Sequence, residues 1–254
     1  MGKVTFDDLD ATRLFDGSRF ESSGRVNGAT YQARVLIADY DRRIESHYSD
    51  ITAPGLGAVC ATASIPFGFR HFGVLFAFDR LTEIDIHDAD MVLRDGLRDA
   101  IARFGAVVFR NAFLSVDLRR RAHRNIFPHL RFHYDRGPRH ENRYSLFTRD
   151  PFDPVQAEPR LSSTLIAANI VAYLQLREES PCDVAKERGM RASYDLFGGQ
   201  DMDGVLGNIV LEQAWDAPRG TGEIVVIDNR TVQHAAYYRT PAGPGYPIGA
   251  RYLY

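Results

Sequence analysis

The feature that most constrains the fold of this chain is a succession of short β-prone runs separated by turn-forming segments. Runs such as "FGVLFAF", "RYSLFTR" and "EIVVIDNR" are rich in aromatic and β-branched residues, whereas "TAPGLG", "DPFDPVQAEP" and "TPAGPGYP" interrupt them. Strands and helices do not alternate regularly, so a purely parallel α/β sheet is not expected. The pattern predicts a mainly β protein with a few flanking helices, built as an antiparallel sandwich or barrel.

The length and charge of the chain narrow its domain organisation and its partners. A single domain over residues 1–254 is expected, because barrels and sandwiches often use 200 to 250 residues as one unit. Residues 1–85 are predicted to be an N-terminal elaboration of unknown role, and residues 86–254 the core of the domain. A formal net charge of -2 gives no basic excess, so nucleic acid and membranes are not expected partners. A small-molecule partner is expected instead.

Targeting signals and cysteine usage indicate where the protein works. No apolar run approaches the roughly 20 residues that span a bilayer, and the first residues lack the pattern of a signal peptide. Cys60 and Cys182 lie far apart without a CxxC spacing, so we expect two unpaired thiols. We therefore expect a cytoplasmic protein, with its oligomeric state open and a homodimer as one possibility.

One helix is well predicted by hydrophobic periodicity. The segment 89–105 places apolar residues near helical spacing and ends at Gly105, a common residue after a helix. These apolar residues are Met91, Val92, Leu97, Ile101 and Phe104. "AVVFRN" follows as a short buried strand, and a second helix is predicted near 170–176. Residues 177–220 have weak periodicity and several glycines, which predicts a surface excursion.

The candidate metal ligands begin with His133 and Asp135. This His-x-Asp pair is weak evidence alone, because 8 histidines and 33 acidic residues in 254 positions yield about one such pair by chance. If residues 131–135 are extended, both side chains point to one side. His234, after the strand and turn of "GEIVVIDNRTVQ", is the best third ligand. Two imidazoles and one carboxylate form the facial ligand set of non-haem iron(II) oxygenases. Arg251 could then hold a carboxylate through its planar fork.

From residue 89 to the end, several blocks in a fixed order resemble one known family. These blocks are "LRDAIARFGAVVFRN", "HYD", "EPRLSSTLIAANIVAYLQL", "GEIVVIDNRTVQH" and "ARYLY". Together they resemble the iron(II)- and 2-oxoglutarate-dependent dioxygenases of the taurine dioxygenase and clavaminate synthase type. The resemblance departs from the family at Ser162-Ser163, where relatives carry Gly-Gly.

The resemblance implies a fold, a cofactor set and site residues. The fold would be a double-stranded β-helix, also called a jelly roll, with flanking helices. His133, Asp135 and His234 would bind iron(II), and Thr164 and Arg251 would hold the distal carboxylate of the cosubstrate 2-oxoglutarate. With dioxygen, such an enzyme hydroxylates an unactivated C–H bond and releases succinate and carbon dioxide. Asp135 favours oxygen chemistry, because relatives that halogenate lack this carboxylate.

Several alternatives are open at this point. The same iron site would also support desaturation or cyclisation, and another metal-dependent jelly-roll enzyme, such as an isomerase, would not consume 2-oxoglutarate. A catalytically silent binding module is a further alternative. A small polar or anionic metabolite, such as an amino-acid derivative of a biosynthetic pathway, is the expected substrate. Arg239 is an alternative holder of the cosubstrate.

The remaining histidines and arginines have plainer interpretations. A helix through 129–133 would put His129 and His133 on one face near His123, but an extended segment is favoured because no HExxH motif is present. His87 and His140 are predicted to be surface residues. A run of arginines near the proposed iron could attract an anionic substrate, although a solvated surface is the commoner outcome. This run comprises Arg136, Arg139, Arg143 and Arg149.

Overall fold

A computed structural model describes parts of both halves of the chain. It describes residues 3–38, 71–115, 123–127, 130–133, 143–153, 161–167, 211–214, 221–238 and 246–253. The helices are η1 (Phe6–Asp8), α1 (Thr12–Phe15) and α4 (Asp95–Phe104). The strands are β1 (Val4–Thr5), β2 (Glu21–Val26), β3 (Ala29–Ile37), β4 (Phe72–Asp85), β5 (Ala106–Leu114), β6 (His123–Phe127), β7 (Leu130–His133), β8 (Tyr144–Arg149), β9 (Leu161–Ala167), β10 (Leu211–Ala214), β11 (Glu223–Asp228), β12 (Val232–Tyr238) and β13 (Tyr246–Leu253). None of the described helices is long and apolar enough to cross a membrane.

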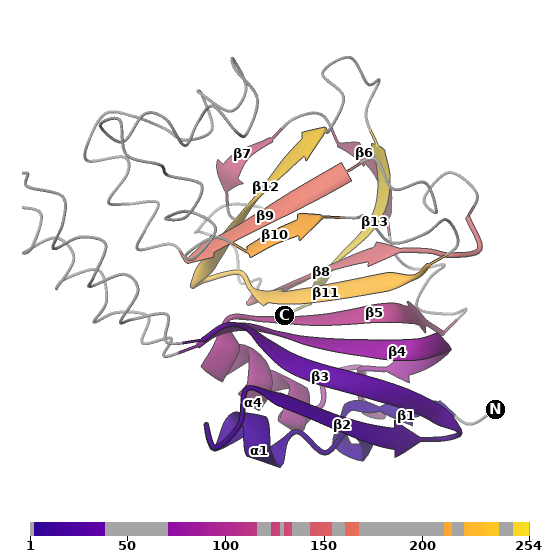
Figure 1. Cartoon of the computed structure of the whole chain (residues 1–254). Coiled ribbons are helices and arrows are strands. Elements are labelled where there is room, and N and C mark those ends of the chain that lie inside the picture. The colour runs from indigo at the N-terminus through magenta and orange to yellow at the C-terminus, as the bar shows by residue number, and fades with distance from the viewer. Residues whose placement is uncertain are drawn as a thin grey trace, which may run out of the picture.

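The strands from β6 to β13 form a jelly roll. A nine-stranded sheet has the order β2-β3-β4-β5-β11-β8-β13-β6, with β1 beside β4, and a four-stranded sheet has the order β10-β9-β12-β7. The chain changes sheet at nearly every step, and these eight strands pair only antiparallel. In Figure 1 the small sheet lies above β8 and β11. The predicted fold, mainly β with flanking helices and a double-stranded β-helix, is confirmed.

The N-terminal segment continues the large sheet. β4 pairs parallel with β5, and α4 forms the connection between them, which is one βαβ unit in an otherwise largely antiparallel sheet. β3 and β2 extend the sheet beyond β4 by antiparallel pairing. The sequence analysis assigned no role to residues 1–85. The described part of this segment adds strands to the large sheet. Figure 1 shows α1 and α4 beside this half of the molecule.

The hydrophobic core lies between the helices and one face of the large sheet. Every second residue of β3 is buried, as expected for a strand with one solvated face. α4 buries Leu97, Ala100, Ile101 and Phe104, a stripe at helical spacing. The rings of Phe76 and Phe109 stack with centroids 5.7 Å apart, and Phe6 from η1 meets both edge-on. Leu146 and Val226 extend the same core onto β8 and β11. The helices therefore cover this face of the large sheet, and the opposite face of the sheet points away from them.

The predicted elements agree with the structure in type and differ in extent. The strands predicted from "AVVFRN", "RYSLFTR" and "EIVVIDNR" are present as β5, β8 and β11. The helix predicted over 89–105 begins only at Asp95, because Met91 has a positive φ of 64° and sits in a turn. Met91 and Val92 are accordingly 39% exposed, against the prediction that they face the core. The segment 177–220 contributes β10 to the small sheet, so at 211–214 it is not a surface excursion. The predicted helix near 170–176 lies outside the described residues.

Candidate metal centre

His234 lies between the two sheets, near the start of β12. The turn before it is tight: Asp228 Oδ1 accepts a hydrogen bond from the backbone N–H of Arg230 at 2.9 Å, and the Asp228 carbonyl accepts one from Thr231 at 3.1 Å. This turn takes the chain from β11 in the large sheet to β12 in the small one. His234 is 5% exposed, and its ring centroid lies 4.6 Å from that of Phe147 on β8. Because β8 belongs to the large sheet, His234 projects from the small sheet into the interior of the jelly roll.

His133 is the cross-strand partner of His234. It is the last residue of β7, and the antiparallel register of β7 and β12 sets it directly opposite His234. In such a ladder, the Cβ atoms of directly opposed residues lie about 4.5–5.5 Å apart on one face. Asp135 lies outside the described residues, and within them no group of three His, Cys, Asp or Glu side chains forms a complete metal site. The structure thus brings two of the three predicted ligands together.

Thr164 and Arg251, the predicted cosubstrate residues, lie on two different strands, β9 and β13. On β9, Leu165 is opposite His234 and Thr164 is opposite Ala235. On β13, Ala250 is opposite Phe147, and Arg251 is opposite Leu146, a residue of the core against α4. Both predicted cosubstrate residues therefore lie on strands of the jelly roll, and their role stays a prediction.

The plainer histidine predictions have mixed outcomes. His123 and His133 lie on strands β6 and β7, so the helical metal site of His123, His129 and His133 is wrong. The prediction that His87 is a surface residue is also wrong, because it is 3% exposed and bridges Leu93. His129 and His140 themselves lie outside the described residues.

A row of charged residues crosses the interior face of the large sheet. Glu223 on β11 stands opposite Arg110 on β5 and opposite Arg149 on β8. Glu223 is fully buried and Arg149 is 2% exposed, so the prediction of a solvated Arg149 is wrong. Of the other arginines in that run, Arg143 is exposed and its guanidinium lies over the ring of Tyr144. Arg136 and Arg139 lie outside the described residues.

Burial dominates the electrostatics of Glu223. Desolvation raises the pKa of its carboxyl group from 4.5 to about 7, and the nearby Arg110 and Arg149 oppose this rise only in part. The Arg110 Nη2 to Glu223 Oε1 distance is 4.0 Å, which is longer than a hydrogen bond. Neither carboxylate oxygen accepts a hydrogen bond from a described residue. Sequence reasoning did not identify Glu223 as a buried residue. Its position before "IVVID" indicates the start of a strand, but not that this strand lies in the middle of the sheet.

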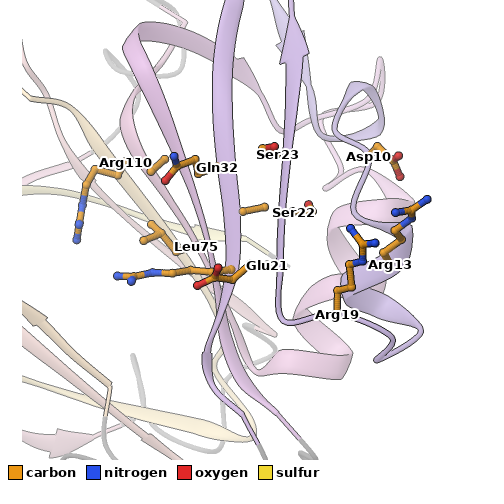
Figure 2. A pocket seen from close by; sticks show the side chains of 12 residues that line it. Asp10, Arg13, Arg19, Glu21, Ser22, Ser23, Gln32, Leu75 and Arg110 are labelled. Carbon is orange, nitrogen blue, oxygen red and sulfur yellow. The ribbon is translucent and has the colours of Figure 1, made fainter.

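A polar cavity adjoins this row on the N-terminal half of the sheet. Its volume is about 710 Å³, and it is lined by residues of β2 to β5 together with the α1 region. Figure 2 shows Arg110 and Gln32 on one side of this cavity and Arg13 and Arg19 on the other. The register row runs from Gln32 through Ala77 to Arg110 and on to Glu223. The cavity and the charged row therefore share one face of the large sheet, through Arg110.

The fold and the histidine pair define a jelly-roll protein with a candidate metal site. No protein-family model and no curated protein match the sequence. Among solved structures, PvcB from Pseudomonas aeruginosa is 11% identical, with a TM-score of 0.40 over 72% of this chain and 86% of that chain. AAD-2 in complex with Mn(II) and N-oxalylglycine is 10% identical, with a TM-score of 0.41 over 73% and 94%. A putative α-ketoglutarate-dependent 2,4-D dioxygenase from Burkholderia xenovorans is 10% identical, with a TM-score of 0.37 over 72% and 93%. A functional assignment therefore rests on the residues of this chain.

Proposed function

We propose that this protein is an iron(II)- and 2-oxoglutarate-dependent oxygenase that hydroxylates an unactivated C–H bond of a small polar or anionic metabolite. The observation that carries the proposal is the register of β7 and β12, which sets His133 opposite His234 inside a jelly roll. Imidazole nitrogens are good ligands for iron(II), and a third ligand from a carboxylate completes the facial set. Asp135, two residues after His133, is the proposed carboxylate ligand.

The described residues fit such a metal. His234 is buried against Phe147, and this ring limits rotation of the imidazole and keeps water from that side. When bound, iron(II) with 2-oxoglutarate and dioxygen supplies the oxidising power for C–H hydroxylation, and succinate and carbon dioxide are the co-products. The protein's own contribution is to hold the reactants in orientation and to exclude water. The family resemblance assigns the cosubstrate carboxylate to Thr164 and Arg251, and that assignment stays a prediction.

Substrate and outcome are parts of the same proposal. A small metabolite with a carboxylate or other polar group suits a cavity and a sheet face that are rich in arginine and poor in apolar surface. Desaturation or cyclisation would use the same iron site with a differently held substrate. A metal-dependent isomerase and a silent binding module are the alternatives from other classes, and both predict that no succinate is formed.

The decisive experiment mixes the protein anaerobically with iron(II) and 2-oxoglutarate. A visible charge-transfer band of the chelate is expected, and succinate is expected once oxygen is admitted. The variant His234→Ala should lose the band and bind iron(II) more weakly in equilibrium dialysis. His123→Ala is the matched control, because His123 lies on β6 in the other sheet and should leave both readouts unchanged.

The outcomes separate the candidate functions. Metal binding without a chelate band would favour the isomerase, and the absence of both in correctly folded protein would favour the binding module. Equal metal affinity of His234→Ala and wild type would mean that the histidine pair is not the metal site. Circular dichroism and thermal unfolding establish in each case that the variant has folded.

A further inference from the structure

The polar cavity on β2 to β5 has an arginine on two of its walls and a small residue at its floor. The cross-strand row sets Gln32 on β3 and Arg110 on β5 on either side of Ala77 on β4. Because the side chain of alanine is much shorter than its two neighbours, the row is hollowed at β4. Arg34 lies two residues after Gln32, so both side chains point to the exposed face of β3. The floor at Ala77 is therefore flanked by guanidinium groups from β3 and β5.

Two more arginines line the cavity from the side of α1. Arg13 belongs to α1, and the backbone N–H of Arg19 donates a hydrogen bond to the Arg13 carbonyl at 3.1 Å. Figure 2 shows both of them away from Arg110 and Gln32, where the cavity extends past β2, the last strand of the large sheet. Arg34 and Arg110 are consequently the pair that shares one sheet face and can act on one small group.

Both guanidinium groups of this pair have hydrogen-bond donors to offer. The Nε atom of Arg110 is buried and has no acceptor among the described residues, and Nη2 lies 4.0 Å from Glu223 Oε1, which is longer than a hydrogen bond. Arg34 forms no ion pair with a described carboxylate, although Glu21 is its cross-strand partner. A buried donor without an acceptor is rare in folded proteins. An oxyanion in the cavity would supply the acceptor.

The arrangement of the donors favours a phosphate group over a carboxylate. The two oxygens of a carboxylate lie in one plane, and a single guanidinium fork satisfies both. A phosphate group carries about -1.5 to -2 charges at pH 7, and its three terminal oxygens point in different directions. It can therefore accept hydrogen bonds from arginines on two walls at once. The cavity volume of about 710 Å³ is in the range of small-molecule sites and leaves room for the rest of a metabolite.

We propose that this cavity binds the phosphate group of a small molecule, held by Arg34 and Arg110, with the amide of Gln32 as a further donor. The site lies on β3 to β5, whereas His234 contacts Phe147 on β8, two strands beyond β5 in the large sheet. The proposal thus goes beyond the oxygenase function and stands independently of a metal at the histidine pair.

The test is a titration of the full chain with inorganic phosphate, followed by ³¹P NMR at constant ionic strength with a chelator present to remove metal. Wild type should bind phosphate saturably, and malonate, the carboxylate probe, should compete about tenfold less well. Arg34→Gln and Arg110→Gln should each weaken phosphate about tenfold, because each loses a charge-assisted hydrogen bond. Arg25→Gln is the matched control, because Arg25 is exposed on β2 and does not line the cavity. It should change the affinity less than about twofold.

A substitution at the floor tests the cavity without changing any charge. Ala77→Leu should abolish saturable phosphate binding, because the larger side chain occupies the space between the two arginines. Should Arg110→Gln not fold, Ala77→Leu and Arg34→Gln carry the test. Absence of saturable binding to wild type, or equal weakening by Arg25→Gln and Arg34→Gln, overturns the site. Malonate binding as tight as phosphate overturns the choice of phosphate. A loss of phosphate binding in His234→Ala would place the anion at the histidine pair and overturn the proposal.

Discussion

The buried carboxyl group of Glu223 predicts an unusual pH dependence of stability. Burial raises its pKa to about 7 in the folded protein, whereas the unfolded chain leaves it near 4.5. Between these two values the folded state holds a proton that the unfolded state releases. The stabilisation is therefore fully present below about pH 4.5 and is lost as the pH rises through 7.

The magnitude follows from the difference between the two pKa values. One pKa unit corresponds to about 1.4 kcal/mol, so a rise from 4.5 to about 7 amounts to about 3 kcal/mol. Glu223→Gln keeps the shape of the protonated side chain and removes the titration. We expect the variant and wild type to have similar free energies of unfolding near pH 4.5. Near pH 8 the variant should be more stable by up to about 3 kcal/mol.

Urea denaturation of both proteins at several pH values between 4.5 and 8 measures this difference. Ser145→Ala is the matched control, since Ser145 is fully buried on the same sheet face and does not titrate in this range. Its stability difference from wild type should therefore be constant with pH. A Glu223→Gln difference that is equally constant would refute the argument, and would show that Arg110 and Arg149 keep Glu223 ionised throughout.

Two further substitutions test the core and the end of α4. Phe109→Ala should lower the free energy of unfolding by about 3–5 kcal/mol, because Phe109 is fully buried and stacks on Phe76. The control Phe152→Ala, at a side chain 57% exposed, should change it by about 0.5 kcal/mol, and comparable losses would place the core elsewhere. Gly105→Ala should cost about 1–2 kcal/mol, because Gly105 ends α4 at a φ of 72° where a Cβ is strained. An unchanged denaturation midpoint would show that the helix end tolerates a negative φ.

Sequence reasoning succeeded where local chemistry decides the structure. β8 and β11 were predictable because their runs of β-prone residues end in charged or turn-forming residues, including the Asp228-Asn229 turn. The end of α4 was predictable from Gly105, but its start was not. Met91 and Val92 continue the apolar spacing yet lie in a turn, where Asp88 Oδ1 accepts the backbone N–H of Val92 at 2.9 Å. The spacing of apolar residues does not reveal such a competing hydrogen bond.

Burial of charged groups was beyond local reasoning. Arg149 stands in a charged stretch and was expected to be solvated, and Glu223 drew no attention at a strand start. Both are buried because β8 and β11 are central strands of the large sheet, with neighbours on either side. The centrality of a strand depends on which distant segments pair with it, and no pattern within the strand records that.

By itself, the sequence determined which segments become strands and which histidines were candidate ligands, because β propensity, turn chemistry and side-chain type are properties of short segments. Tertiary structure alone decided that His133 stands opposite His234, and that Arg149 and Glu223 are buried on central strands of the large sheet. The physical reason is the two-residue period of a strand. A shift of one residue between paired strands moves a side chain to the other face, so the register, set by contacts across the whole sheet, determines which charges meet the site.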